Sequence, residues 1–217
     1  LKAFGYSIVS LQSGYFPAEL EISNKAIDTQ HLNAALAPVL SLWQLPLIRN
    51  FISQNLHFAH QEMVLDSFEK VSQLSGLPGP KFVFVHLLVP HPPFVLSGVS
   101  TGMLGQKSYS LGDGDHYGDH AQYRADYREQ ITKVSEFLLE AIPALIKASD
   151  GKAVVIVQGD HGPGSELKFA ERSKSNHSER FGILNAYYFP NRDYSKLYPS
   201  ISPINSFGAA LSTLFNI

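Results

Sequence analysis

The sequence has 217 residues, a length that allows one sizeable domain. Hydrophobic residues make up 44% of the chain, charged residues 17%, and the formal net charge is −2, so nothing in the charge favours nucleic acid or an anionic membrane surface as a partner. The absence of cysteine excludes disulfides and thiolate metal sites.

The first half of the chain predicts a strand, a helical region and a second strand. Residues 6–11 mix β-branched and polar residues after a glycine, which is typical of a strand leaving a turn. Between 29 and 73 apolar residues recur at three- and four-residue spacing, which predicts helix, with Pro38 and Pro46 starting or kinking it. The near-continuous apolar run 81–89, "KFVFVHLLV", predicts a strand buried on both faces.

The second half predicts a long loop, a long helix, two strands and a final helix. The loop covers 90–118, and loops of this length in compact domains are often functional. A single apolar stripe predicts a helix over 123–148, with a late kink at Pro143. The remaining elements are strands at 152–158 and 182–190 and a helix that begins near Pro203 with Ser202 as N-cap.

Strands separated by helical segments predict an α/β fold, with a largely parallel sheet sandwiched by helices, and one domain over residues 1–217. No apolar run reaches the ~20 residues that a membrane-spanning helix needs, and no signal-peptide pattern is present. The sequence opens with Leu1-Lys2-Ala3 and no initiator methionine, so we expect a part of a longer protein.

Two predicted strands end in residues that can do chemistry. In "VVIVQGDHGPGSE", residues 154–166, a β-branched run leads into Asp160 and His161 within a glycine-rich turn. Ligands of open α/β sheets gather at the carboxyl ends of strands, and a carboxylate beside an imidazole suits Zn²⁺ or Mn²⁺. The structural alternative is an aspartate that caps a turn and a histidine bonded to backbone. "FVHLLVPHPPF" supplies His86 and His91, whose structural alternatives are a core histidine and a turn histidine.

Taken together, these segments resemble the sulfatase-like branch of the alkaline phosphatase superfamily. The matching segments are "QGDHGPGS", "FVFVHLLVPHPPF", "ERFGILNAYYFP" and "YPSISPINSF". Their order and separation also match, so the resemblance covers nearly the whole chain, and it is closest to the membrane-anchored sulfatase-like hydrolases and transferases.

The resemblance implies a role for five residues. Asp160 and His161 become ligands of one divalent metal ion, Mn²⁺, Zn²⁺ or Ca²⁺. His91 becomes the histidine that holds the anionic group, His86 a partner behind it, and His177 a further substrate contact. The implied substrate is a small anionic ester, a lipid head group or a glycan. The implied location is extracytoplasmic, periplasmic or at the cell surface, in a parent that is anchored in the membrane by segments upstream.

The chain departs from the family pattern at its start. Family members carry another metal-binding acid and a Ser, Thr or formylglycine nucleophile before the segment that looks like "LKAFGYSIVSLQSGY". The hydroxyls of Ser10, Ser13 and Thr29 do not lie in such a context. We therefore expect the domain to be truncated on its N-terminal side, to hold only part of the active site, and to be inactive alone.

Two further groups of residues are better explained by structural roles than by functional ones. The loop "DGDHYGDH", 113–120, offers acids and histidines for a second metal or substrate site, but a solvated loop with a helix N-cap explains it better. Lys174 and Arg180 have the charge to assist an anion, and we expect both on the surface.

The leading interpretation is an extracytoplasmic, metal-dependent hydrolase or transferase of phosphate or sulfate esters. The alternative is a non-catalytic sulfatase-like module that binds a glycan or a protein partner. A generic α/β protein with a structural Asp160–His161 pair comes third, because it leaves the four matching segments unexplained. The ester type, the acceptor and the metal stay open.

Overall fold

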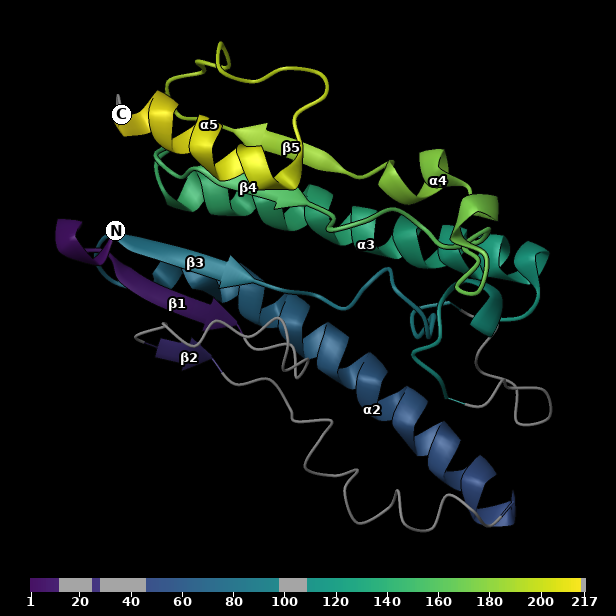
Figure 1. Ribbon diagram of the computed structural model, residues 1–217. Helices are drawn as coiled ribbons and strands as arrows, with labels where there is room; N and C mark the ends of the chain where they lie inside the picture. Colours follow the sequence, from purple (N-terminus) through teal and green to yellow (C-terminus); the bar gives the residue numbers. More distant parts are fainter. Residues whose placement is uncertain (12–24, 28–45, 98–108, 216–217) are drawn as a thin grey trace.

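The computed structural model describes residues 1–11, 25–27, 46–97 and 109–215 (Figure 1). Its strands are β1 (Ser7–Leu11), β2 (Lys25–Ile27), β3 (Lys81–Val85), β4 (Val155–Gln158) and β5 (Asn185–Tyr188). Its helices are α2 (Pro46–Gln73), α3 (His120–Ala148), α4 (His177–Phe181) and α5 (Pro203–Phe215), with short 3-10 turns between them. No helix among these residues combines the length and the apolarity needed to cross a membrane.

The strands form two small sheets. The first is parallel, in the order β2-β1-β3, with Val9 of β1 opposite Val83 of β3. The second is the antiparallel pair β4-β5, with Gln158 opposite Asn185. The α/β fold and the parallel sheet are as predicted, whereas the antiparallel pairing of β5 is not what the sequence indicated. Among the described strands β3 pairs only with β1 and β4 only with β5, so each leaves one edge without a strand neighbour.

The core lies where the two long helices cross behind the sheets. Helix α3 buries a stripe at three- and four-residue spacing that begins with Tyr123, Asp126 and Gln130 and continues to Val134, which is the pattern of a helix with one covered face. Between α2 and α3 the rings of Phe68 and Phe137 stack with centroids 3.9 Å apart. The buried residues around this stack are Val64, Val89, Val95 and Val134.

Most predicted elements are confirmed, with different boundaries. Pro46 is the first residue of α2, as its fixed φ favours, while the part of the helical prediction that covers 29–45 lies outside the described residues. The strand predicted at 81–89 ends at Val85, which pairs with Leu11, the last residue of β1. Its burial on both faces was predicted wrongly: all five residues of β3 are half-buried, because β3 is an edge strand here.

Removal of the Phe68 ring should destabilise the protein strongly. Phe68 is 9% exposed and stacked on Phe137, so Phe68→Ala leaves a cavity between α2 and α3 and should lower the free energy of unfolding by roughly 3 kcal/mol. Phe58 of the same helix is 63% exposed, so Phe58→Ala should cost less than ~1 kcal/mol. Urea unfolding of both variants checks this, and equal losses would contradict the packing described.

Candidate functional site

Asp160 and His161 lie directly after β4, where the chain turns away from the sheet. The Asp160 side chain is 84% exposed and the His161 side chain 31% exposed, and Oδ2 of the first lies 3.5 Å from Nε2 of the second. Nδ1 of His161 lies 2.9 Å from the carbonyl oxygen of Gly162. Because a carbonyl can only accept, Nδ1 carries the proton, and the neutral ring therefore presents the Nε2 lone pair toward Asp160.

This geometry fits a metal-binding pair. Two ligand atoms of a tetrahedral zinc site, each about 2.0–2.1 Å from the ion, lie roughly 3.3 Å apart, close to the 3.5 Å observed between Oδ2 and Nε2. The backbone hydrogen bond of His161 is the usual support for a metal-bound imidazole. The pair supplies two ligands. In the part of the chain that is described, no group of three or more acids and histidines is arranged to hold an ion.

His91 lies beside the pair. Its ring meets the ring of His161 edge-on, with centroids 6.2 Å apart, and its Nδ1 lies 2.6 Å from the carbonyl oxygen of Pro92. The structure therefore brings together His91, His161 and Asp160 from segments about seventy residues apart in sequence. The hydrogen bond to Pro92 fixes the Nδ1 proton on His91 as well, so Nε2 is again the free ring atom.

The loop that carries His91 is held by one buried amide. Gln130 of α3 is fully buried; its Nε2 donates to the carbonyl oxygen of His91 at 3.2 Å, and its Oε1 accepts from the backbone N–H of Leu96 at 3.0 Å. From α2, Gln61 donates to the carbonyl oxygen of Val95 at 2.9 Å. Both long helices therefore bind segment 91–96, which we call the histidine-proline loop. Gln130 contacts both of its ends.

Two more histidines lie near the site. Burial lowers the pKa of His86, and the negative charge of Asp160 partly offsets this, which places His86 within electrostatic reach of the pair. His60 of α2 is fully buried, with Nδ1 3.3 Å from Oη of Tyr109. Burial, with the nearby histidines His57 and His91, lowers the pKa of His60 to about 4, so His60 is neutral at physiological pH.

The glycine-rich turn after His161 is held by an ion pair between the partly buried Arg180 and the buried Asp113. Arg180 Nη1 donates to Asp113 Oδ2 at 2.7 Å and to the carbonyl oxygen of Gly162 at 3.2 Å. Tyr123 Oη donates to Asp113 Oδ1 at 2.8 Å and accepts from the backbone N–H of Gly164 at 2.9 Å. Asp113 is only 6% exposed. The carboxylate therefore anchors both sides of the turn through one arginine and one tyrosine.

The protonation of Asp113 follows from these partners. Burial acts to raise the pKa of the carboxyl, but the hydrogen bonds from Tyr123, from the Gly114 N–H and from Arg180 outweigh it. The pKa therefore lies below its ordinary value, and the group stays charged. Asp113 and Arg180 consequently form an ion pair throughout the neutral range.

Several predicted residues have other surroundings. His177 is exposed on α4 and stacks on Phe181, with ring centroids 5.9 Å apart. Lys174 pairs with Glu171 on the surface, as expected. The surface prediction for Arg180 is wrong, because its guanidinium is partly buried against the carboxylate of Asp113. Asp119 caps α3 through the N–H groups of residues 121 and 122, which confirms the N-cap in the loop 113–120. Ser10 is buried in β1, while Ser13 and Thr29 lie outside the described residues.

Sequence patterns missed the residues that support the site. Asp113 lies between two glycines, and Gly164 leaves no room for a side chain, since a Cβ there would come within 2.5 Å of the Asp113 carboxylate. The glycines beside Asp113 and at position 164 indicate that another segment packs closely against each, but the sequence does not show which segment it is. Gln130 lies at a covered position of an apolar stripe, and a glutamine there is the one available hint that a buried polar contact exists.

A methyl group at Gly162 should distort the turn. A Cβ there would lie 2.1 Å from the carbonyl oxygen of Glu179 and 2.6 Å from that of Gly182, and backbone atoms cannot easily move aside. Gly162→Ala should lower the free energy of unfolding by more than ~2 kcal/mol. Gly208 in α5 has open space, so Gly208→Ala should be neutral or stabilising by up to ~1 kcal/mol. Thermal unfolding compares them, and a tolerated Gly162→Ala would refute the tight turn.

The buried His60 should make stability depend on pH. Between about pH 4 and 6.5 the unfolded chain binds a proton that the folded chain does not, so the free energy of unfolding should rise with pH across this window, by about 3 kcal/mol at most. His60→Gln should flatten the rise, whereas replacement of the exposed His116 by glutamine should leave it unchanged. Chemical denaturation at several pH values measures both slopes, and an unchanged slope in His60→Gln would be the contrary result.

Curated proteins and solved structures gave no match to the chain. A family model described as Sulfatase matches residues 15–200, a range that contains the histidine-proline loop, the pair after β4 and the residues that support them. This match extends over most of the sequence and bears out the resemblance and the α/β fold. The chain belongs to the sulfatase family, within the alkaline phosphatase superfamily.

Proposed function

We propose that the chain forms part of the active site of an extracytoplasmic, metal-dependent hydrolase or transferase of phosphate or sulfate esters. The family supports ester chemistry in general. The observation that carries the finer proposal is the juxtaposition of Asp160, His161 and His91, with both histidine rings fixed by backbone carbonyls. The extracytoplasmic location and the membrane anchor that the resemblance implies belong to the same proposal.

Each residue then has a chemical task. Asp160 and His161 Nε2 hold one divalent ion, which would neutralise charge on the transferring group and acidify a hydroxyl. His91 approaches the anionic group with Nε2, and because its Nδ1 proton is engaged by Pro92, the ring donates to an anion only as an imidazolium. His86 and His177 are proposed as further contacts, the first beside Asp160 and the second on α4.

Buried and partly buried hydrogen bonds fix His91 and the turn after His161, as a catalytic site requires. A catalytic geometry needs its groups fixed by residues that are themselves locked in place. Gln130 fixes the carbonyl oxygen of His91, and Asp113 with Arg180 fixes the turn after His161. Because these supports are buried or nearly so, solvent does not compete with their hydrogen bonds.

Metal titration of the full-length protein tests the proposal. Mn²⁺, Zn²⁺ or Ca²⁺ should raise the unfolding temperature, since an ion present at a hundred times its dissociation constant adds about 2.7 kcal/mol to the native state. Asp160→Ala combined with His161→Ala should abolish the shift and the hydrolysis of 4-nitrophenyl phosphate or sulfate. The control, Asp150→Asn with His116→Ala, removes the charge of an equally exposed aspartate, 86% against 84%, and an exposed histidine. Asparagine is used because Asp150 has φ +53, a left-handed conformation in which alanine would be strained.

The outcomes separate the two interpretations. Loss of both metal stabilisation and turnover in the site variant alone supports the enzyme. Metal stabilisation without turnover of either ester supports the non-catalytic module that binds a glycan or protein partner. A shift that persists in the site variant refutes the assignment of Asp160 and His161 as ligands.

A further inference from the structure

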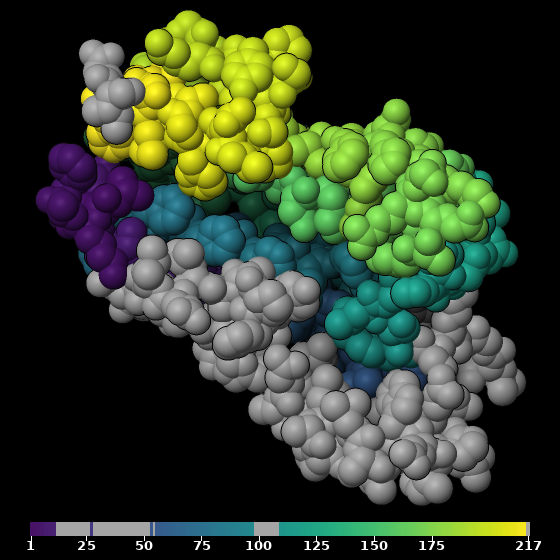
Figure 2. Space-filling view, in the orientation of Figure 1, coloured from purple at the N-terminus to yellow at the C-terminus, as the bar shows by residue number. Residues whose placement is uncertain are grey.

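The surface of the molecule is hollowed beside α5, between that helix and β3 (Figure 2). Among the described strands β3, which borders this hollow, pairs only with β1, and β4 pairs only with β5. The segments that follow β3 and β4 meet at the site, where the ring centroids of His91 and His161 lie 6.2 Å apart. Both strands therefore point their carboxyl ends the same way, as Figure 1 also shows.

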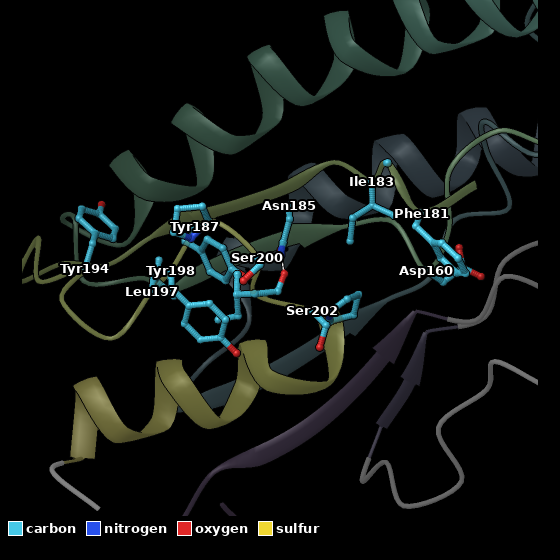
Figure 3. Close-up of a pocket in the computed structure, with 14 residues that line it drawn as sticks. Asp160, Phe181, Ile183, Asn185, Tyr187, Tyr194, Leu197, Tyr198, Ser200 and Ser202 are labelled. Carbon is cyan, nitrogen blue, oxygen red and sulfur yellow. Dashed lines mark hydrogen bonds between the residues drawn. The ribbon is translucent and has the colours of Figure 1, made fainter. Parts of the chain in front are cut away.

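Helix α5 lies over both sheets. Its Phe207 packs against Phe82 of β3, with ring centroids 6.2 Å apart, and its Ser206 Oγ lies 2.7 Å from Oη of Tyr187 in β5. Figure 3 shows Tyr187 on the side of β5 that faces α5, in the cavity between β5 and the segment that leads into the helix. One helix therefore covers one face of each sheet.

Helix α3 lies on the opposite face of both sheets. Val83, which alternates with Phe82 along β3, packs against the core cluster that contains Ala141 of α3. On β5, Tyr188 Oη donates to the carbonyl oxygen of Gly151, just beyond the end of α3, at 3.3 Å. Two sheets that share a helix on each face belong to one layer, and that layer is interrupted between β3 and β4.

The strands on the two sides of the interruption have the composition of interior strands. β3 reads KFVFV and β4 reads VIVQ, so both are apolar on both faces. Such runs are typical of strands covered on both faces by helices, whereas natural edge strands are usually protected by charge, proline or a bulge. Every residue of the two strands is nevertheless only half-buried. A neighbour in the interruption would complete their burial.

The reach of α5 limits the interruption to one strand. Neighbouring strands lie about 4.8 Å apart, so one further strand would place β3 and β5 about 14 Å apart, and two would place them about 19 Å apart. A helix measures about 10–12 Å across with its side chains, and α5 contacts the long side chains of Phe82 and Tyr187 on the two sides. The shorter span is compatible with both contacts, and the longer one is not.

We propose that one β-strand from a segment of the same polypeptide outside the described residues lies between β3 and β4 and joins the two sheets into one. Because α3 and α5 cover both faces of this layer, the added strand is apolar on both faces and uncharged. Because it bonds to a neighbour on each edge, it contains no proline. A position enclosed by two helices forms as the chain folds, which favours the same polypeptide over a second molecule. The proposal does not depend on the ester chemistry.

Hydrogen exchange of the full-length protein, read at single residues, tests the proposal. Alternate N–H groups of a strand point to opposite edges, so a β3 with β1 as its only neighbour has slow and fast amides in alternation. With a strand on each side, all amides of residues 82–85 and 155–158 should exchange at least ~100-fold more slowly than in an unfolded chain. Alternation of fast and slow amides along either strand would overturn the proposal.

Photo-crosslinking identifies the neighbour. Phe84→p-azidophenylalanine keeps the shape of a side chain of β3 that would lie about 4.5–5.5 Å, Cβ to Cβ, from the added strand. Irradiation of the full-length protein should link it to one apolar segment outside the described residues, within a single molecule. Phe58→p-azidophenylalanine is the control, since Phe58 is 63% exposed on α2 and should not link to that segment.

Each other result of the crosslinking contradicts the proposal. Links from position 84 only to β4 or β5 would mean that the two sheets close directly on each other, and links between two molecules would mean that a second copy supplies the strand. No link, or the same link from position 58, would also refute it. Ester turnover is measured separately: the link without metal-dependent turnover rejects only the proposed function, and turnover without the link rejects only the added strand.

Discussion

The ion pair between Asp113 and Arg180 is the interaction on which the arrangement of the site depends. It joins the loop before α3, which carries Asp113, to the short helix α4, which carries Arg180. The turn that follows Asp160 and His161 is hydrogen-bonded to this pair. Arg180 reaches the carbonyl oxygen of Gly162 directly, while Tyr123 carries the connection from the carboxylate to Gly164. Removal of Arg180 would leave the buried Asp113 carboxylate uncompensated, and removal of Asp113 would do the same to the partly buried guanidinium. Either change would also release the turn.

A second support acts on the other side of the site and uses neutral groups. Gln130 joins the two ends of the histidine-proline loop, so α3 carries both supports on one face: Tyr123 for the turn and Gln130 for His91. The two residues are seven positions apart, which is two helical turns, and they point in the same direction. The distance between His91 and His161 is consequently set by one rigid helix rather than by the loops that bear them.

The sequence predicts the fold and the two segments of the site better than it predicts what supports them. Strand runs such as 152–158, the apolar stripe of α3 and the start at Pro46 follow from periodicity and from proline chemistry, and each is present. Asp160 and His161 are predictable because strand ends collect ligands in α/β folds. The partners of Asp113 and Gln130 are not predictable, because each lies tens of residues away and only tertiary packing selects it. The antiparallel pairing of β4 and β5 was not predicted either. A parallel neighbour needs a long crossover connection, usually a helix, and segment 159–184 contains no long helix.

The strand edges noted in the fold have a consequence for how the protein behaves in concentrated solution. On the described residues β3 and β4 each present backbone N–H and C=O groups on one side, with half-buried valines and phenylalanines around them. Such edges are templates for pairing with another chain, and natural proteins usually guard them with charge. Here a net charge of −2 spread over 217 residues gives little mutual repulsion near neutral pH. Molecules of this chain therefore stay separate only if another segment or partner covers the free edges of β3 and β4. If these edges are exposed to solvent, self-association should increase with protein concentration.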